Sequence, residues 1–125
     1  MNSQNEFPYL CALRGATTCE NNSVESITSA VEELLVELIS RNNLIPDQII
    51  SITFSVTSDL DACFPASIAR KKAGWDKIAL LDCQQMFVKD DLLKCIRLLA
   101  YVSLPKEQIP KNPYLGNAKN LRPDR

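Results

Sequence analysis

The chain has 125 residues, of which 46% are hydrophobic and 23% are charged, and its formal net charge is −1. This composition is typical of one globular domain rather than a disordered or fibrous chain, and the small net charge argues against a nucleic-acid binder held mainly by phosphate contacts. Histidine is absent, which excludes Ser-His-Asp and Cys-His nucleophilic mechanisms and most catalytic zinc sites.

The ends and the cysteines indicate the compartment. No apolar run approaches the roughly 18 residues that a membrane span needs, and the first six residues lack the basic start and apolar stretch of a signal peptide, so we expect a cytoplasmic protein with no membrane partner. The five cysteines are an odd number and contain no C-x-x-C pair. Reduced core cysteines are therefore expected, rather than a disulfide framework or a zinc site.

The first part of the chain predicts a strand and then a long helix. Residues 9–16 read as a strand that enters a turn, with Gly15 free to adopt a backbone conformation that other residues avoid. Asn22 and Glu25 form an N-x-x-E capping box that begins a helix, and the helix is expected to stop near residues 42–43. Apolar residues recur along it at three- and four-residue steps, which predicts an amphipathic helix: Val24, Ile27, Val31, Leu34, Leu35, Leu38 and Ile39.

The middle of the chain predicts two strands around a short helix. After a turn at Pro46, residues 50–57 alternate apolar and hydroxyl side chains, so one face of this strand is apolar and the other suits solvent or a subunit contact. Residues 64–70 suit a short helix with a proline in its first turn, ended by Gly74. A strand over residues 77–83 follows.

The last predicted strand covers residues 92–102 and carries an arginine among apolar neighbours. Alternation places five side chains on one of its faces: Leu93, Cys95, Arg97, Leu99 and Tyr101. Because an arginine is costly to bury alone, Arg97 is expected either to meet an anionic ligand or to pair with a protein carboxylate or reach the sheet edge. From Arg70 onward, twelve bases stand against six acids, which favours a small anion, although solvated lysines are the alternative. Beyond Pro105 we expect an irregular tail that orders by docking on a neighbour.

Short motifs in a fixed order carry a family resemblance. They are Leu13-Arg14-Gly15-Ala16-Thr17-Thr18, Asp59-Leu60-Asp61-Ala62-Cys63-Phe64-Pro65-Ala66, Gly74-Trp75, Gln84 with Met86, Leu93-Lys94-Cys95-Ile96-Arg97, and Tyr114 with Leu121-Arg122-Pro123-Asp124. Each is weak alone, but together they cover residues 9–124 and resemble the monofunctional chorismate mutases of the trimeric pseudo-α/β-barrel class.

The resemblance implies a fold and an assembly. It implies one α+β domain over residues 1–125, with a mixed β-sheet packed against one long amphipathic helix and a short helix. Residues 1–8 are then an N-terminal extension, and residues 105–125 are a C-terminal tail that closes over the site. Three copies are expected to form a pseudo-α/β barrel, a homotrimer whose active sites lie between subunits.

The implied reaction is the intramolecular [3,3] rearrangement of chorismate to prephenate in phenylalanine and tyrosine biosynthesis, which makes the protein an isomerase, an intramolecular transferase. A pericyclic step uses no nucleophile, metal or other cofactor. It needs a site that holds the substrate folded and a fixed cation that meets the negative charge growing on the ether oxygen.

Site residues are carried over by position. Arg97 matches the family's cation at the ether oxygen, and Arg14 and Tyr114 match the residues that hold the carboxylate of the enolpyruvyl arm. Further matches lie at the pocket wall and mouth and in the closing tail: Phe64, Arg70, Leu121 and Arg122.

Two departures from the family pattern concern carboxylates. The family's glutamate, which accepts a hydrogen bond from the ring hydroxyl, aligns with Gln85, and the cysteine three residues earlier aligns with Asp82. Either Asp82 takes the hydroxyl and offsets Arg97 from the other side, or Asp82 is a structural partner of Arg97 and Gln85 takes the hydroxyl in a slower enzyme. A lysine at the pocket mouth is replaced by Ser67, and one residue is deleted between Val102 and Tyr114.

Two other functions remain open at this point. One is a non-catalytic trimeric protein that binds a small anion or regulates through it on the same fold. The other is imine or enamine hydrolysis in a subunit cleft, as in the reactive-intermediate deaminases, although the motifs of that family are not found here.

Overall fold

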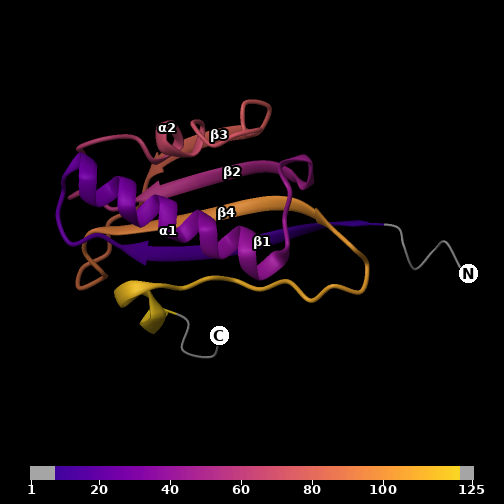
Figure 1. Cartoon of the computed structure of the whole chain (residues 1–125). Helices are drawn as coiled ribbons and strands as arrows, with labels where there is room; N and C mark the ends of the chain where they lie inside the picture. Colours follow the sequence, from indigo (N-terminus) through magenta and orange to yellow (C-terminus); the bar gives the residue numbers. More distant parts are fainter. Residues whose placement is uncertain (1–7, 122–125) are drawn as a thin grey trace, which may run out of the picture.

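The computed structural model describes residues 8–121, and its centre is one four-stranded mixed sheet. The strands are β1 (Tyr9–Thr18), β2 (Ile49–Val56), β3 (Ala79–Gln84) and β4 (Cys95–Leu104), in the spatial order β1-β4-β2-β3. β4 runs antiparallel to both β1 and β2, whereas β3 is parallel to β2. Figure 1 shows α1 (Val24–Asn42) crossing one face of this sheet, with α2 (Pro65–Ala69) beside β3. The predicted α+β arrangement of a mixed sheet, one long helix and one short helix is confirmed.

The N-cap of helix α1 lies one residue later than predicted. The N-cap is Ser23, whose hydroxyl accepts a hydrogen bond from the Ser26 amide at 3.1 Å, so the predicted box between Asn22 and Glu25 is wrong. Asn22 instead reaches across to the segment before α2, where its amide oxygen accepts bonds from the Asp61 and Ala62 amides. The helix ends as expected, with Asn43 in the left-handed conformation that asparagine tolerates.

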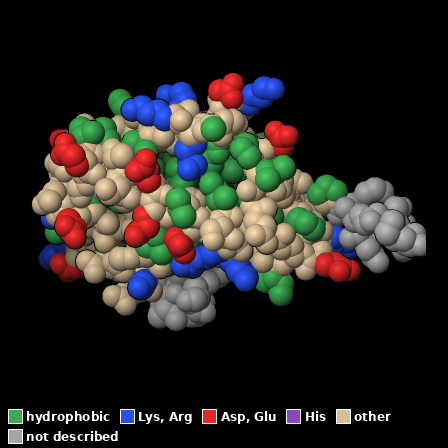
Figure 2. Space-filling view, viewed as in Figure 1, with side chains coloured by type: hydrophobic (Ala, Val, Ile, Leu, Met, Phe, Trp, Pro, Cys, Tyr) green, Lys and Arg blue, Asp and Glu red, His purple; other side chains and the backbone are tan. Residues whose placement is uncertain are grey.

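The core lies between α1 and the sheet. The apolar stripe of α1 packs on the inward side chains of the strands, and both sets are almost fully buried. The largest fully buried apolar side chains are Phe54, Leu13, Ile27, Leu34, Leu35, Leu38, Ile52, Ile96, Leu104, Val31 and Val102. Val24, predicted on this stripe, is the first residue of α1 and is 53% exposed, so the buried stripe begins at Ile27. Acidic and polar side chains cover much of the outward surface near the start of α1 in Figure 2.

A bulge changes the start of β2. The register against β4 shifts between Ile49 and Ser51, so Ile49 is buried and Ile50, predicted on the apolar face, is 53% exposed. An extra residue in one strand moves the preceding side chain to the other face. From Ile52 onward the predicted alternation holds, and the hydroxyl side chains face away from α1.

The boundaries of the other strands also differ from the prediction. β4 runs from Cys95 to Leu104, so Leu93 lies before the strand and is 68% exposed. β3 starts two residues later than expected. β1 continues through Gly15, which has no turn conformation. A Cβ at Gly15 would lie 3.1 Å from the Pro113 carbonyl oxygen, so this position needs a small side chain and not an unusual backbone angle.

The C-terminal segment docks on β1 of its own chain. It runs along the free edge of β1 (Figure 1), where the Ala16 amide donates to the Pro113 carbonyl and the Leu115 amide donates to the Ala16 carbonyl, at 3.0 and 2.8 Å. A 3-10 helix, η3 (Gly116–Leu121), follows. Arg122 and residues 1–7 lie outside the described residues.

Within residues 8–121, no helix is both long enough and apolar enough to cross a membrane.

Candidate active site

A cleft of about 370 Å³ opens on the face of the sheet that α1 leaves uncovered, a size within the range of small-molecule sites. It brings together four of the predicted site residues, and β2 contributes two hydroxyl groups from its outward face. The side chains that line it include Arg14, Thr53, Ser55, Arg97, Tyr114 and Leu121. We call this the cation half-site.

The register of the sheet places both arginines in this cleft. Arg97 on β4 stands opposite Ser55 on β2 and Ala16 on β1, and Arg14 stands opposite Leu99, two residues further along β4. Residues two apart in a strand share a face, so the two guanidinium groups project from the same side of the sheet. The cation half-site therefore presents two permanent positive charges to one small volume, which suits a substrate with carboxylate groups.

Tyr114 reaches the cleft through the docked C-terminal segment. It forms a parallel bridge with Ala16, and the Asn112 side chain accepts a hydrogen bond from the Arg14 amide at 2.8 Å. These contacts fix the segment against β1 beside Arg14. The close approach depends on Gly15, whose missing side chain leaves room for Pro113.

Arg97 forms an ion pair with a protein carboxylate, one of the predicted alternatives, but its partner, Asp91, was not identified from the sequence. Its Nη2 lies 3.2 Å from Oδ2 of Asp91, and the two side chains are 36% and 27% exposed. The same oxygen accepts a hydrogen bond from Nε2 of Gln85 at 3.1 Å. The sequence indicates that Arg97 needs a protein carboxylate or an anion, but it does not indicate which carboxylate. Asp91 lies in an irregular loop, and side-chain periodicity does not predict the path of such a loop.

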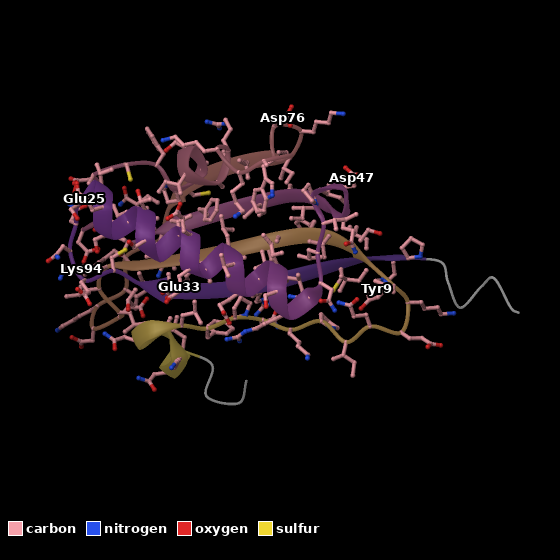
Figure 3. All side chains as sticks on the ribbon, in the orientation of Figure 1. Tyr9, Glu25, Glu33, Asp47, Asp76 and Lys94 are labelled. Carbon is pink, nitrogen blue, oxygen red and sulfur yellow. The ribbon has the colours of Figure 1, made fainter. Side chains whose placement is uncertain are left out.

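Two atoms of this cluster stay buried without a hydrogen-bond partner among the described residues. They are Oε1 of Gln85 and Nε of Arg97. A buried polar atom without a partner is costly, so these two atoms mark where a further donor and a further acceptor fit. Figure 3 labels Lys94, which closes the loop just before β4, at the end of the sheet where α1 begins.

Asp82 does not lie beside Arg97 in the single chain. It stands opposite Phe54 on β2, whereas Arg97 shares the other face with Ser55 and Cys83. Its Oδ1 accepts a hydrogen bond from the Ala66 amide in the first turn of α2, at 3.0 Å. Burial raises the pKa of Asp82 above its ordinary value, although the Ala66 amide and the Arg70 charge act in the opposite direction. Neither predicted contact between Asp82 and Arg97 is therefore present within one chain.

Asp82 belongs instead to a second cleft, of about 660 Å³, at the side of the sheet near α2. Phe64, at the N-cap of α2, is 70% exposed there, and Ser67 also lines it. Arg70 ends α2 and is exposed. We call this the wall half-site. Most of the predicted site residues thus fall into two groups that do not face one another on a single chain. Gln85 lies outside both clefts, in a pocket that it lines together with Asp91, next to Arg97.

Among residues 8–121, no three or more His, Cys, Asp or Glu side chains are grouped so as to hold a metal ion.

Comparisons with known proteins point in one direction. The family model described as chorismate mutase type I matches residues 10–125. The protein named chorismate mutase AroH from Bacillus subtilis (strain 168) is 37% identical over 114 residues, which cover 90% of this chain and 89% of that protein. The one of the same name from Thermus thermophilus is 34% identical over 115 residues, with coverage of 90% and 93%. The solved structure of a chorismate mutase from Clostridium thermocellum matches with a TM-score of 0.81 and 41% identity, over 88% of this chain and 98% of that one.

Proposed function

We propose a division of roles among the site residues on one premise: the chain belongs to the chorismate mutase type I family and is a chorismate mutase, an isomerase. The reaction moves bonds within one molecule of chorismate, so the protein must fold the substrate and stabilise its transition state. The observation that carries the proposal is the pair of arginines on one open face of the sheet, in a cleft that Tyr114 also lines.

Arg97 meets the ether oxygen as the C–O bond breaks. Its guanidinium is always charged, it comes from the middle of the sheet, and its side chain is about one-third exposed beside the cleft. A cation fixed in place before the reaction costs no reorganisation when the charge develops. Loss of one such donor typically raises the barrier by about 2.7–4 kcal/mol.

Arg14 and Tyr114 hold the carboxylate of the enolpyruvyl arm. Both line the cation half-site, and both are placed by the contact between β1 and the C-terminal segment. Holding this arm over the ring supplies the geometric part of catalysis. Leu121 lines the same cleft at the end of η3, which supports a closing role for the tail that begins there and includes Arg122.

The ring hydroxyl has two candidate acceptors, and two observations favour Gln85 over Asp82. Gln85 has an unpartnered buried oxygen, among residues 8–121, in the same cluster as Arg97. Asp82 already accepts a bond from the Ala66 amide and contributes, with Phe64 and Arg70, to the wall and mouth of the site.

The complete site lies between subunits of a homotrimer. The cation half-site and the wall half-site open in different directions on one chain, so a neighbouring copy is needed to bring them together. The chain also exposes Leu10, Leu81 and Tyr101 on its strands, apolar surface that suits burial against another copy. Three such sheets form the pseudo-α/β barrel.

The cytoplasmic location stays a prediction.

Subunit complementation tests the roles and the shared site together. Arg97→Ala should lower kcat by about two to three orders of magnitude with the oligomer intact, and Phe64→Glu should inactivate the wall half-site by placing a negative charge against the dianionic substrate. If each site takes one half from each of two neighbours, random mixed trimers of the two variants should regain about a quarter of the wild-type activity.

Loss of the absorbance of chorismate measures the rate, and size-exclusion chromatography with light scattering checks the assembly. The two variants made separately are the controls. Mixed trimers no more active than the two parents would contradict a site shared between subunits. Full activity in Arg97→Ala alone would remove the central role of that residue.

A further inference from the structure

The carboxylate of Asp91, a residue outside the family resemblance, bonds both Arg97 of the cation half-site and Gln85. Oδ2 of Asp91 accepts hydrogen bonds from both Arg97 and Gln85, at 3.2 and 3.1 Å. Its other oxygen, Oδ1, accepts from the Leu92 amide at 2.8 Å. In all three contacts Asp91 is the acceptor, so both of its oxygens have donors among the described residues.

No other negative group near Arg97, within residues 8–121, is free to balance its charge. Asp59 accepts bonds from the Thr57 hydroxyl and the Lys94 amide. Burial raises the pKa of the neighbouring Cys95 thiol, and the charge of Arg97 offsets this rise only in part. The Cys95 thiol is therefore neutral near pH 7. Asp82 faces the other side of the sheet. Asp91 is therefore the negative partner of Arg97 within the described part of the chain.

The same contact decides which way the Gln85 amide points. Only its NH₂ group is able to donate to the Asp91 carboxylate, so the amide oxygen must point to the other side. That oxygen is one of the two buried side-chain atoms without a partner in the described part of the chain. Asp91 thus turns a glutamine, which is both donor and acceptor, into a one-sided acceptor in the position where the family has a glutamate.

The loop that carries Asp91 is bonded at both ends, to the last residue of β2 and to the turn that follows β2. The backbone N–H of Gln85 donates to the Val56 carbonyl at 2.7 Å, which extends the pairing of β2 and β3 by one residue. At the other end, the Lys94 amide donates to Asp59 at 2.8 Å. Asp90 and Lys94 have positive φ angles of 67° and 50°, which turn the chain back toward β4. Backbone hydrogen bonds at both ends of the loop therefore fix where the carboxylate enters the site.

We infer that Asp91 is a positioning residue that supplies, one loop away, the negative charge that Gln85 lacks: it holds the Arg97 guanidinium at the cleft and aims the Gln85 oxygen at the substrate hydroxyl. The inference rests on the role proposed above for Arg97. If the inference is right, the carboxylate of this site works from either position 85 or position 91, and exchanging the two side chains tests this.

The first test is Asp91→Asn, which keeps the shape of the side chain and removes its charge. The amide introduced at position 91 has one oxygen for donors on two sides. If this oxygen accepts from the Leu92 amide, the NH₂ group faces Arg97 and Gln85, and the Gln85 side chain must turn over; if it faces Arg97 and Gln85, the Leu92 amide loses its acceptor. In both orientations the negative charge beside Arg97 is gone. We expect kcat to fall about tenfold to a hundredfold, as for a small misplacement of catalytic groups, with a smaller change in KM and an unchanged oligomer. Asp90→Asn is the matched control, because Asp90 is exposed and asparagine tolerates its left-handed conformation; its kcat should equal that of the wild type.

The second test exchanges the two side chains. In the double variant Gln85→Glu/Asp91→Asn, the carboxylate introduced at position 85 accepts from the amide introduced at position 91 and keeps an oxygen for the substrate. At least half of the lost kcat should therefore return on a logarithmic scale. Gln85→Glu alone brings two carboxylates together, which is unfavourable, and should be slower than the exchanged double variant. Rescue by exchange is a result that a merely structural role for Asp91 would not give.

The outcomes separate this inference from the proposed function. If Arg97→Ala is inactive but Asp91→Asn has wild-type kcat, or lowers only the melting temperature, Asp91 has no positioning role and the role of Arg97 stands. If Asp91→Asn is slow and the double variant is equally slow, the exchange of charge is wrong. If Arg97→Ala is fully active, the proposed role of Arg97 itself fails, and the inference fails with it.

Discussion

Phe54 and Ser55 are neighbours on β2, but their side chains meet different surroundings. Phe54 is fully buried beneath α1, whereas Ser55 lies on the other face, opposite Arg97 and at the edge of the cation half-site. The same alternation holds along β4, where Ile96 and Leu98 are buried on either side of Arg97. One face of the sheet therefore holds the fold together, and the other is left open for ligand and partner subunits.

The comparison predicts that adjacent substitutions have very different effects. Phe54→Ala removes a fully buried aromatic ring and should lower the free energy of unfolding by about 3–5 kcal/mol. Ser55→Ala, one residue away, should change it by no more than about 0.5 kcal/mol. Denaturant titration of both variants measures the difference. Similar losses for the two would mean that the open face also supports the single chain.

Asn42 breaks the simple division, because a buried polar residue at the end of α1 supports the active-site segment. Its side chain donates to the Leu38 and Lys111 carbonyls, at 2.9 and 2.8 Å, and accepts from the Lys111 amide at 2.8 Å. Asn42 is fully buried, so it clamps the segment that carries Tyr114.

Asn42→Ala should therefore damage both stability and substrate binding. Unpaired backbone groups left in the interior cost roughly 1–3 kcal/mol, and a loosened segment should raise KM through Tyr114. Thermal unfolding and steady-state kinetics measure the two effects. Lys111→Ala is the matched control, since only the backbone of Lys111 takes part in the clamp. A normal KM in Asn42→Ala would show that β1 alone holds the segment in place.

The smallest effect concerns Asp82, which lies outside the cation half-site. Because burial raises its pKa in the folded chain, the folded state binds the proton more tightly than the unfolded state. Stability is then lost as pH rises from the ordinary value of 3.8 through the raised value. Asp82→Asn keeps an acceptor for the Ala66 amide and removes the titrating group, so it should be slightly more stable than the wild type near pH 7.

Melting temperatures measured at intervals from about pH 3 to about pH 7 test this sign. The gain from Asp82→Asn should shrink toward acidic pH, where the wild-type carboxyl is protonated in both states. A gain that grows as pH falls would mean that the Ala66 amide and Arg70 outweigh burial.

Regular side-chain periodicity predicts the long helix, the strands and the place of Arg97 on one face of β4. The apolar spacing of α1 and the hydroxyl face of β2 follow from side-chain periodicity, and the ordered motifs identified the family that the comparisons confirm. The failures occur where periodicity is interrupted. The bulge beside Ile50 depends on pairing with β4, and the cap at Ser23 depends on competition from Asp61 for Asn22.

Asp91 could not be found by the same means. Alignment with the family gives only Asp82 and Gln85 as candidates, because alignment compares positions that match. A carboxylate that reaches the site from an irregular loop leaves no signal in such a comparison. Only the path of the loop, with Asp90 and Lys94 in left-handed conformations, shows which acid reaches the guanidinium.

The docking of the C-terminal segment on β1 also bears on how the protein avoids aggregation. An uncovered edge strand offers unpaired amide and carbonyl groups to any other strand it meets, and here Pro113 and Leu115 occupy both backbone groups of Ala16. A chain cut before Pro113 would expose the unpaired edge of β1 beside the open face of the sheet. Proteolysis of this segment should therefore make the enzyme precipitate, in addition to removing Tyr114.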